Sequence, residues 1–338
     1  MHKLRFILKT ILGMDYKNML KKARVVHGRT RKSTLFILVD MVLCGLKYGA
    51  GYMDYTVLEF YRHNKAQRDT FMTRGRSNQL VKALNDRAYW HFFEDKTEFL
   101  TRFSAYLNRA WINLKTCDAQ AFAQFCEGRD KIMVKPVDGD GGKGVERILL
   151  ADYPDKAALY YRLLQSNQTL AEEYVVQHPD LAAIYPGSVN TLRIVTVVRE
   201  DGGVDITRCL IRIGAGGVVD NISSGGMAAL LDPKTGEITM PAHDKNGDTH
   251  YVHPITGARI VGAAVPMFDK VLEMVTRAAK EVPQIRYCAW DVAVCENGPV
   301  FIEGNQYPGH EIQQLPPHIE DHTGLWPIYK KYLSRQEG

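Results

Sequence analysis

The 338-residue sequence predicts an α+β protein in which a helical N-terminal lobe precedes a region rich in antiparallel β-sheet. Two changes of pattern support this prediction. Up to about residue 111, apolar residues recur at spacings of three and four, as in Leu35, Leu38 and Val42, which is the period of a helix. From Lys131 onward, short β-branched runs alternate with turns rich in glycine and proline, which is typical of strands joined by hairpins.

The elements of the second region can be placed in chain order from their flanking turns. We predict strands over 131–135, 145–150 and 170–176 with a helix over 153–164, followed by strands over 192–198, 204–213 and 227–231. The polar stretch 244–257 is expected to be a surface loop. A helix is expected from Pro266 to Glu281, because proline is tolerated in the first turn of a helix.

A hairpin closes this series of elements. It lies within Ala289–Pro308, which reads A-W-D-V-A-V-C-E-N-G-P-V-F-I-E-G-N-Q-Y-P. The dipeptide Asn297-Gly298 tolerates positive φ and marks the turn. In the second strand, Glu303 and Asn305 are two residues apart, so their side chains leave the same face of the sheet.

The length of the turn decides whether Asp291 shares this face. A two-residue loop at Asn297-Gly298 would place Val292 opposite Glu303, whereas a three-residue loop over 296–298 with a glycine bulge would place Asp291 there. We predict the three-residue loop. Carboxylates this close repel one another unless a hard cation lies between them, and oxygen ligands suit Mg²⁺. The hairpin therefore predicts magnesium ligands at Asp291, Glu303 and Asn305.

Composition and charge narrow the class of protein. A hydrophobic fraction of 45% with 24% charged residues is typical of a globular protein, and six cysteines without a C-x-x-C pair predict reduced thiols in the cytoplasm. Residues 1–33 hold ten Lys or Arg and one acid. We expect this basic arm to be a solvated basic helix, with contact to anionic lipid or nucleic acid as the alternative; of these two partners we expect the membrane and no nucleic acid. The apolar run 34–46 is interrupted by Asp40 and is too short to span a bilayer.

A glycine loop, V-K-P-V-D-G-D-G-G-K-G-V, spans Val134–Val145. It contains the spacing G-x-G-x-x-G, but a dinucleotide-binding loop should open a helix and this loop opens a strand. It is not a P-loop, because Lys143 is followed by glycine instead of serine or threonine. A hairpin loop remains, whose free N–H groups can fold over phosphates while Lys135 on the preceding strand extends toward the same space.

The order of the motifs resembles the ATP-grasp superfamily. The motifs are D-K at 95–96, V-K-P with the glycine loop, E-E-Y-V, N-T-L-R, R-I-G-A-G-G-V-V-D-N-I-S-S-G-G, W-D-V and F-I-E-G-N-Q-Y-P-G. H-P-D-L-A at 178–182, the Asn-Thr pair of N-T-L-R and the helical lobe resemble the narrower sugar-transfer-associated branch. The resemblance covers residues 95–315. It implies an ATP-grasp fold of two α+β subdomains gripping ATP, with a helical basic lobe over 1–94, a lid subdomain over 95–180 and a C-terminal subdomain with the metal site over 181–338.

The resemblance also implies roles for single residues. The expected cofactor-binding residues are Lys96, Lys135, Gly139, Asp140, Gly141, Gly142, Lys143, Gly144, Glu172, Glu173, Tyr174, Val175 and Asp180. Backbone groups of Glu173 and Val175 would hold the adenine, and the ribose ligand stays open among Gln177, His178 and Asp180. The expected catalytic residues are Lys135, Arg193 and Arg212, and the expected substrate-binding residues are Asn190, Arg212, Asn221, Gly225, Gly226 and His310. Asp291, Glu303 and Asn305 match the family's magnesium positions, where two ions are expected.

The implied activity is that of an ATP-dependent carboxylate–amine ligase, which forms an amide or peptide bond through an acyl-phosphate. The branch name suggests saccharide-related or secondary-metabolite biosynthesis. No serine or cysteine triad pattern is present, and phosphoryl transfer needs none, because positioning and charge neutralisation supply the catalysis. A phosphotransferase acting on a hydroxyl and a non-catalytic, membrane-associated nucleotide-binding protein are the alternatives. The carboxylate, the amine and the oligomeric state, with a homodimer as one alternative, are left open by the sequence.

Overall fold

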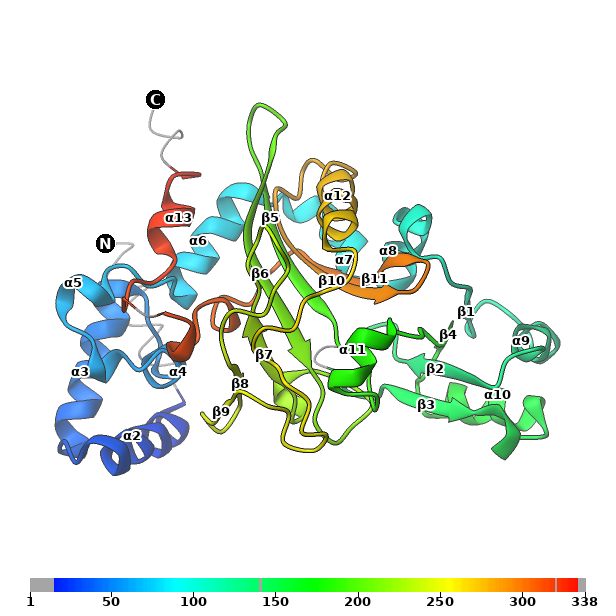
Figure 1. Cartoon of the computed structure of the whole chain (residues 1–338). Helices are drawn as coiled ribbons and strands as arrows, with labels where there is room; N and C mark the ends of the chain where they lie inside the picture. The colour runs from blue at the N-terminus through cyan, green and yellow to red at the C-terminus, as the bar shows by residue number, and fades with distance from the viewer. Residues whose placement is uncertain (1–14, 140–141, 320, 334–338) are drawn as a thin grey trace. The chain divides into compact units, whose positions relative to one another are not determined.

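The computed structural model describes residues 15–139, 142–319 and 321–333. Contacts divide the chain into two compact units, one made of Met1–Ala83 with Gly309–Gly338 and the other of Leu84–Pro308 (Figure 1). The first fourteen residues of the basic arm, and the predicted phosphate-loop residues Asp140 and Gly141, lie outside the described residues. The division into lobes at residues 94 and 180 stays a prediction.

The first unit is helical, as the apolar periodicity predicts. Asp15 caps its first helix by accepting the N–H of Asn18, and Ser33 caps the next by accepting the N–H of Phe36. The core of the unit is aromatic, with Tyr55 and Phe60 fully buried. Its helices are α2 (Tyr16–Thr30), α3 (Thr34–Tyr48), α4 (Tyr52–Val57), α5 (Lys65–Arg68), α6 (Arg74–Leu84) and α13 (Trp326–Lys330). None of the described helices is long and apolar enough to cross a membrane.

The second unit holds two antiparallel sheets. The smaller has the order β1-β4-β2-β3, and the apolar faces of two helices cover it, with Phe122 and Leu159 fully buried against Ile132 and Ile148. Its elements are β1 (Trp111–Asn113), α9 (Ala119–Cys126), β2 (Lys131–Lys135), β3 (Glu146–Leu149), α10 (Lys156–Gln165) and β4 (Leu170–Glu173). The two strands predicted around the glycine loop are therefore confirmed as β2 and β3.

The larger sheet has the order β11-β10-β5-β6-β7-β8-β9. Its long strands β5 (Leu192–Val198) and β6 (Val204–Ile213) have the predicted bounds, and every residue of β5 is buried. An aromatic cluster that includes Trp290, Phe103 and Phe301 packs against the sheet. The remaining strands are β7 (Met227–Leu230), β8 (Ala242–Asp244), β9 (Thr249–His250), β10 (Tyr287–Cys295) and β11 (Gly298–Asn305), and the helices are α7 (His91–Glu94), α8 (Lys96–Arg102), α11 (Pro179–Ile184) and α12 (Phe268–Ala278).

Two local predictions are wrong. The helix expected from Pro266 begins at Phe268, because Met267 takes a left-handed conformation at φ 51° and serves as the N-cap residue. The stretch 244–257 is not a plain surface loop: β8 and β9 pair across a turn that the Asp244 carboxylate closes by accepting backbone N–H groups. Within the same stretch, His253 is buried, where its Nε2 hydrogen-bonds the Gly214 carbonyl.

Candidate functional site

The β10–β11 hairpin places Asp291 directly opposite Glu303, as predicted, but the turn differs from the prediction. Cys295 pairs with Gly298, so the loop contains two residues and not three. The register changes further along, where Val292 pairs with Phe301 and Asp291 pairs with Glu303. Ile302 is thus the extra residue of a β-bulge, and this bulge, not a longer turn, aligns the two carboxylates.

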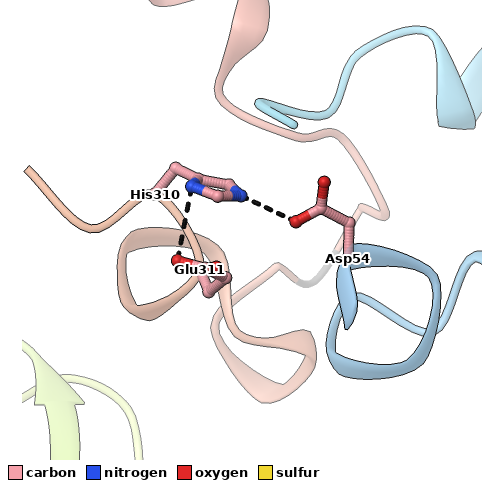
Figure 2. Close-up of side chains that lie close together, drawn as sticks. All are labelled: Asp54, His310 and Glu311. Atoms are coloured by element: carbon pink, nitrogen blue, oxygen red, sulfur yellow. Dashed lines mark hydrogen bonds and ion pairs between the residues drawn. The ribbon is translucent and has the colours of Figure 1, made fainter. Parts of the chain in front are cut away.

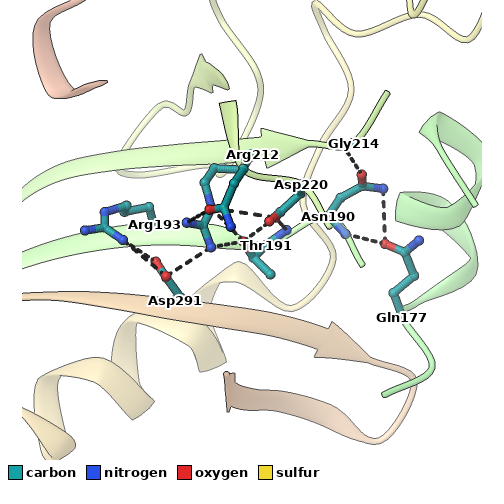
Figure 3. A network of polar contacts seen from close by, with 9 residues as sticks. Gln177, Asn190, Thr191, Arg193, Arg212, Gly214, Asp220 and Asp291 are labelled. Atoms are coloured by element: carbon teal, nitrogen blue, oxygen red, sulfur yellow. Dashed lines mark hydrogen bonds and ion pairs between the residues drawn. The ribbon is translucent and has the colours of Figure 1, made fainter. Parts of the chain in front are cut away.

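Asp291 is completely buried between two arginines, as Figure 3 shows. Arg193 Nη1 donates to its two carboxylate oxygens at 2.9 and 3.1 Å, and Arg212 Nη2 lies 3.0 Å from its Oδ2. Burial alone would raise the pKa of Asp291, but the two guanidinium groups outweigh it and hold that pKa below its usual value. Asp291 is therefore an ionised anchor that fixes both arginines.

Glu303 has the opposite tendency. Burial, followed by the negative charge of Asp291 and a hydrogen bond to it, raises the pKa of Glu303 above its usual value. The Asp291–Glu303 pair therefore carries one negative charge readily, whereas a second negative charge needs a compensating positive charge nearby. Asn305 follows two residues later on β11, and its Nδ2 is buried without a hydrogen-bond partner among the described residues. Two facing carboxylates suit a divalent cation, and the carboxamide oxygen of Asn305 is the third candidate ligand.

A cavity is lined by residues of both sheets. Nine of the residues expected to bind the cofactor line it: Lys96, Lys135, Gly139, Gly142, Lys143, Glu172, Glu173, Tyr174 and Val175. Arg212, Asn221 and Glu303, which were predicted for catalysis, substrate and metal, line it as well. An adjoining cavity shares Lys96, Lys135, Gly139 and Glu303 with it and extends to Asn305. The structure thus places the glycine loop, the lysines and the acidic hairpin around connected space.

The two lysines are held in different ways. Lys96 donates to the carbonyl oxygens of Val137 at 3.1 Å and Gly139 at 2.7 Å, so it supports the glycine loop. Lys135 Nζ lies 2.7 Å from Glu172 Oε1. Burial would raise the pKa of Glu172, but Lys135 and Arg109 lower it below its usual value. The side chain of Glu172, expected at the adenine hinge, is therefore a buried counter-ion for these two cations.

Arg109 is a site-supporting residue that the sequence did not reveal. Its Nε and Nη2 each lie 3.2 Å from Glu172 Oε2, and its Nη1 donates to the Phe301 carbonyl. It therefore ties β4 to β11, which are far apart in the sequence. It stands in an unremarkable segment, Asn108-Arg109-Ala110, and no motif spacing could have identified it.

Some of the residues predicted at the adenine hinge line the cavity, whereas the residues predicted at the ribose do not. Tyr174 and Val175 line the cavity at the end of β4, and Lys131 Nζ lies 4.0 Å from the Tyr174 ring centroid. The N–H of Glu173, however, donates to the Ala110 carbonyl at 2.9 Å and is engaged within the small sheet. The ribose candidates Gln177, His178 and Asp180 are not among the described residues that line the cavity, and the Asp180 side chain is 69% exposed.

Arg212 lines the cavity and is the centre of a buried polar network (Figure 3). Its Nε and Nη2 donate to Thr191 Oγ1 at 3.0 and 2.7 Å, and its Nη1 donates to Asn221 Oδ1 at 3.0 Å. Asp220 accepts the N–H and hydroxyl of Thr191, and burial raises the pKa of Asp220 despite the nearby Arg212. Thr191 and Asp220 were missed, although each stands next to a predicted residue, Asn190 and Asn221.

Gly225 and Gly226 shape the loop that carries Asp220. Gly225 has φ 103° and ends the short helix Ile222–Ser224. A Cβ on Gly226 would lie 2.1 Å from the Asp220 carbonyl oxygen, so only glycine allows the loop to close this tightly. The positive φ of Gly225 and the close backbone contact of Gly226 thus both require glycine, and the tight loop positions Asn221 at the cavity.

Asn190, predicted to bind substrate, is fully buried and its amide is occupied. Its Nδ2 donates to Gln177 Oε1 and to the Leu181 and Tyr185 carbonyls, while its Oδ1 accepts the N–H of Gly214 (Figure 3). The prediction is corrected, because no hydrogen-bonding group of this side chain remains for a substrate. Asn190 holds the loop behind Thr191 in place.

His310, also predicted to bind substrate, belongs to the first unit and is buried there. Its Nε2 lies 2.7 Å from Asp54 Oδ1 and its Nδ1 lies 3.3 Å from Glu311 Oε2 (Figure 2). Asp54 in turn accepts the backbone N–H of Arg74 at 2.8 Å. The contact of Nε2 with Asp54 joins residues 309–311 to α4, whereas Nδ1 makes no hydrogen bond among the described residues. The prediction that His310 binds substrate at a site mouth stays a prediction.

Comparisons with known proteins agree with this arrangement. A family model described as sugar-transfer associated ATP-grasp matches residues 148–319, whereas no curated protein matches the chain. The solved structures that are similar include the ADP complex of purK, N5-carboxyaminoimidazole ribonucleotide synthetase, at 9% identity and TM-score 0.40, covering 65% of this chain and 46% of that chain. The chain thus spans less than half the length of that enzyme.

Two further solved structures have similar scores. The ATP-grasp ligase PsnB complexed with minimal precursor has 14% identity and TM-score 0.43, with 80% of this chain and 76% of that chain covered. D-alanyl-alanine synthetase A from Vibrio cholerae has 15% identity and TM-score 0.44, with 72% and 66% covered. The family match extends over half of the sequence and includes the bulged hairpin and the Arg212 network. The chain therefore belongs to the sugar-transfer-associated ATP-grasp family.

Proposed function

We propose that the protein is an ATP-dependent carboxylate–amine ligase that forms an amide or peptide bond and releases ADP and phosphate. One observation carries the proposal: a single cavity joins the lysines and glycine loop of the small sheet to Arg212 and Glu303 of the large sheet. Cations for the phosphates and an acidic pair for a divalent ion are the two requirements of phosphoryl transfer. The family membership supports the same nucleotide.

The nucleotide half of the site rests on the small sheet. Tyr174 and Val175 at the end of β4 would border the adenine, and Lys135 would contact the phosphates. Glu172 holds Lys135 in place and shares its charge with Arg109, so two cations face one buried anion. The excess positive charge remains available to phosphate oxygens.

Asp291, Glu303 and Asn305 would hold magnesium. When bound, Mg²⁺ neutralises charge on the phosphate oxygens. The raised pKa of Glu303 favours its protonated form, so a cation and a proton would compete for this carboxylate. The buried pair of Asp291 with Arg193 keeps the anchor ionised throughout.

Arg212 would support the transfer itself. A substrate carboxylate oxygen attacks the γ-phosphorus, and the bond to the ADP oxygen breaks with its electron pair leaving on ADP. The amine nitrogen then attacks the acyl carbon, phosphate leaves with the bonding pair, and the amine gives up a proton. Arg212 lines the cavity and is fixed by Thr191 and Asn221, so its charge is preorganised for the oxygens that become negative. The enzyme needs no nucleophile of its own.

The proposal is tested by incubating the protein with ATP, Mg²⁺ and a matrix of uronic, amino and hydroxy acids with amines. A ligase releases both ADP and free phosphate only in wells that contain an acid and an amine. A phosphotransferase produces ADP without free phosphate in wells that contain a hydroxyl acceptor, and this outcome would replace the ligase by the alternative function. We expect saccharide-linked acids or amines among the productive pairs. Glu303→Gln should abolish turnover, whereas Glu296→Gln, at the exposed turn of the same hairpin, should retain it.

A further inference from the structure

Helix α3 of the first unit exposes a continuous apolar face. Six large hydrophobic side chains are exposed on its fifteen residues: Leu35 at 72%, Phe36 at 57%, Val39 at 52%, Val42 at 36%, Leu43 at 57% and Leu46 at 54%. Their spacing of three, four and seven places them on one side of the helix. A contiguous exposed apolar surface of this kind marks an interaction site on a folded protein.

The opposite side of α3 is also packed, so the exposed face is not a displaced core. Ile37, Met41 and Cys44 are buried in the core of the unit. The one acid of the helix, Asp40, points inward, where Arg68 Nη2 lies 2.8 Å away and the Tyr55 hydroxyl donates at 2.7 Å. The helix is therefore apolar on its buried and its exposed sides and keeps its one carboxylate inside, whereas the exposed side of an ordinary surface helix is polar.

The neighbouring helix α2 supplies positive charge. Lys17, Lys21 and Arg24 are exposed at helical spacing, and Arg31 is exposed at its end. No acid occurs between residues 16 and 39. Helices α2 and α3 share one hydrophobic core and are joined by three residues, so the cations and the apolar face belong to one rigid helical pair (Figure 1).

We propose that the exposed face of α3 docks onto a membrane surface that contains anionic phospholipids. The helix would lie parallel to the bilayer with its apolar side chains among the acyl chains, while the cations of α2 contact the headgroups. Charge complementarity selects this occupant, because a basic helical pair whose one acid, Asp40, is turned inward matches an anionic surface. At fifteen residues α3 is about 22 Å long, which is shorter than the roughly 30 Å core of a bilayer, so docking and not spanning is expected.

This proposal is independent of the proposed enzymatic function. It also moves the expected lipid contact from a basic arm alone to a defined helical face. Asp40, which interrupts the apolar run in the sequence, proves to be turned away from that face. The structure therefore allows a membrane-facing surface that the sequence pattern concealed.

The test is co-sedimentation of the full chain with vesicles of phosphatidylcholine alone or with one third phosphatidylglycerol. We expect binding to the anionic vesicles that is at least tenfold stronger and that weakens with added salt. The double variant Val39→Glu/Leu43→Glu should lose at least tenfold in binding while its circular dichroism spectrum and nucleotide affinity stay unchanged. Tyr161→Glu on α10 is the matched control, because Tyr161 is an exposed apolar residue at 58% in the other unit, and it should bind as wild type.

Three outcomes would overturn the proposal. The first is wild-type protein that stays in the supernatant with anionic vesicles. The second is a dimer seen by light scattering without lipid that Leu43→Glu dissociates, since a second copy would then be the occupant. The third is loss of vesicle binding on deletion of residues 1–14 with no loss in the double variant, since the arm alone would then carry the contact.

Discussion

Asp291 and Glu303 face each other across the β10–β11 pair because Ile302 is inserted as a bulge between the hairpin turn and the two acids. In the register set by the turn, Ile302 would stand opposite Asp291. The inserted residue brings a second carboxylate next to one that two arginines already hold ionised. Ionisation of Glu303 beside Asp291 is therefore unfavourable unless a cation binds to the pair.

Glu303→Gln should stabilise the metal-free protein at neutral pH. The pKa of Glu303 is raised in the folded state, so the folded protein binds a proton at Glu303 more tightly than the unfolded chain does. The stability that this protonation contributes is lost as the pH rises through the folded-state pKa. Glutamine removes the repulsion without changing the shape. Thermal denaturation between pH 5 and 8 should show a higher Tm for the variant, by about 2–4 °C, with the difference growing as pH rises. A Tm advantage that is the same at every pH would contradict this account.

Arg109→Ala should destabilise the second unit by about 3–5 kcal/mol, because it leaves a buried carboxylate with one cation fewer. Arg109 and Glu172 are 3% and 6% exposed in their side chains. Arg129→Ala is the control, since Arg129 lies 3.6 Å from a Glu173 side chain that is 45% exposed, and should cost less than about 1 kcal/mol. Urea unfolding measures both, and equal costs would show that Glu172 does not depend on Arg109.

The same buried carboxylate predicts a response to acid. The pKa of Glu172 is lowered in the folded state, so its stabilising contribution is present above the ordinary glutamate pKa and is lost as pH falls through the folded value. Glu172→Gln should therefore flatten the loss of unfolding free energy below about pH 4.5, while lowering stability at neutral pH. An unchanged acid slope in this variant would place the acid-sensitive group elsewhere.

Gly226→Ala should disturb the Arg212 network, because the added Cβ would meet the Asp220 carbonyl oxygen at 2.1 Å. Backbone must move, so we expect a loss of about 2 kcal/mol or more and weaker nucleotide-dependent turnover. Gly217→Ala, in the same segment, meets its nearest atom only at 4.0 Å and should be tolerated. Denaturation and turnover should be measured for both variants, Gly226→Ala and Gly217→Ala. Comparable losses in the two would contradict this account, because the loop would then be sensitive to any substitution.

The strands and the β10–β11 hairpin could be predicted because their signals are local. The β5 and β6 runs are long, β-branched and bounded by a clear turn, and the order of polar motifs identified the hairpin acids. The prediction that Asp291 pairs with Glu303 was correct for a wrong reason, since a bulge at Ile302 has no strong sequence mark. The residue types in the motifs indicated that Asp291 and Glu303 should be neighbours, but they did not indicate the bulge at Ile302 that aligns the two side chains.

The remaining site residues depend on contacts between distant segments. Arg109 reaches Glu172 across 63 positions, and His310 reaches Asp54 across 256. Asn190 belongs to the N-T-L-R motif, but its side-chain amide donates hydrogen bonds to Gln177 and to neighbouring carbonyls. A polar residue in a motif can serve either a ligand or a loop, and only its burial and its hydrogen bonds distinguish the two.

The central claim is that the hairpin acids hold the metal that accompanies the nucleotide. Isothermal titration of a non-hydrolysable ATP analogue, with and without Mg²⁺, tests it most directly in wild type, Glu303→Gln and Glu296→Gln. We predict that Mg²⁺ strengthens binding at least tenfold in wild type and Glu296→Gln but has little effect in Glu303→Gln, whose metal-free affinity stays close to wild type. A magnesium effect of full size in Glu303→Gln would contradict the claim.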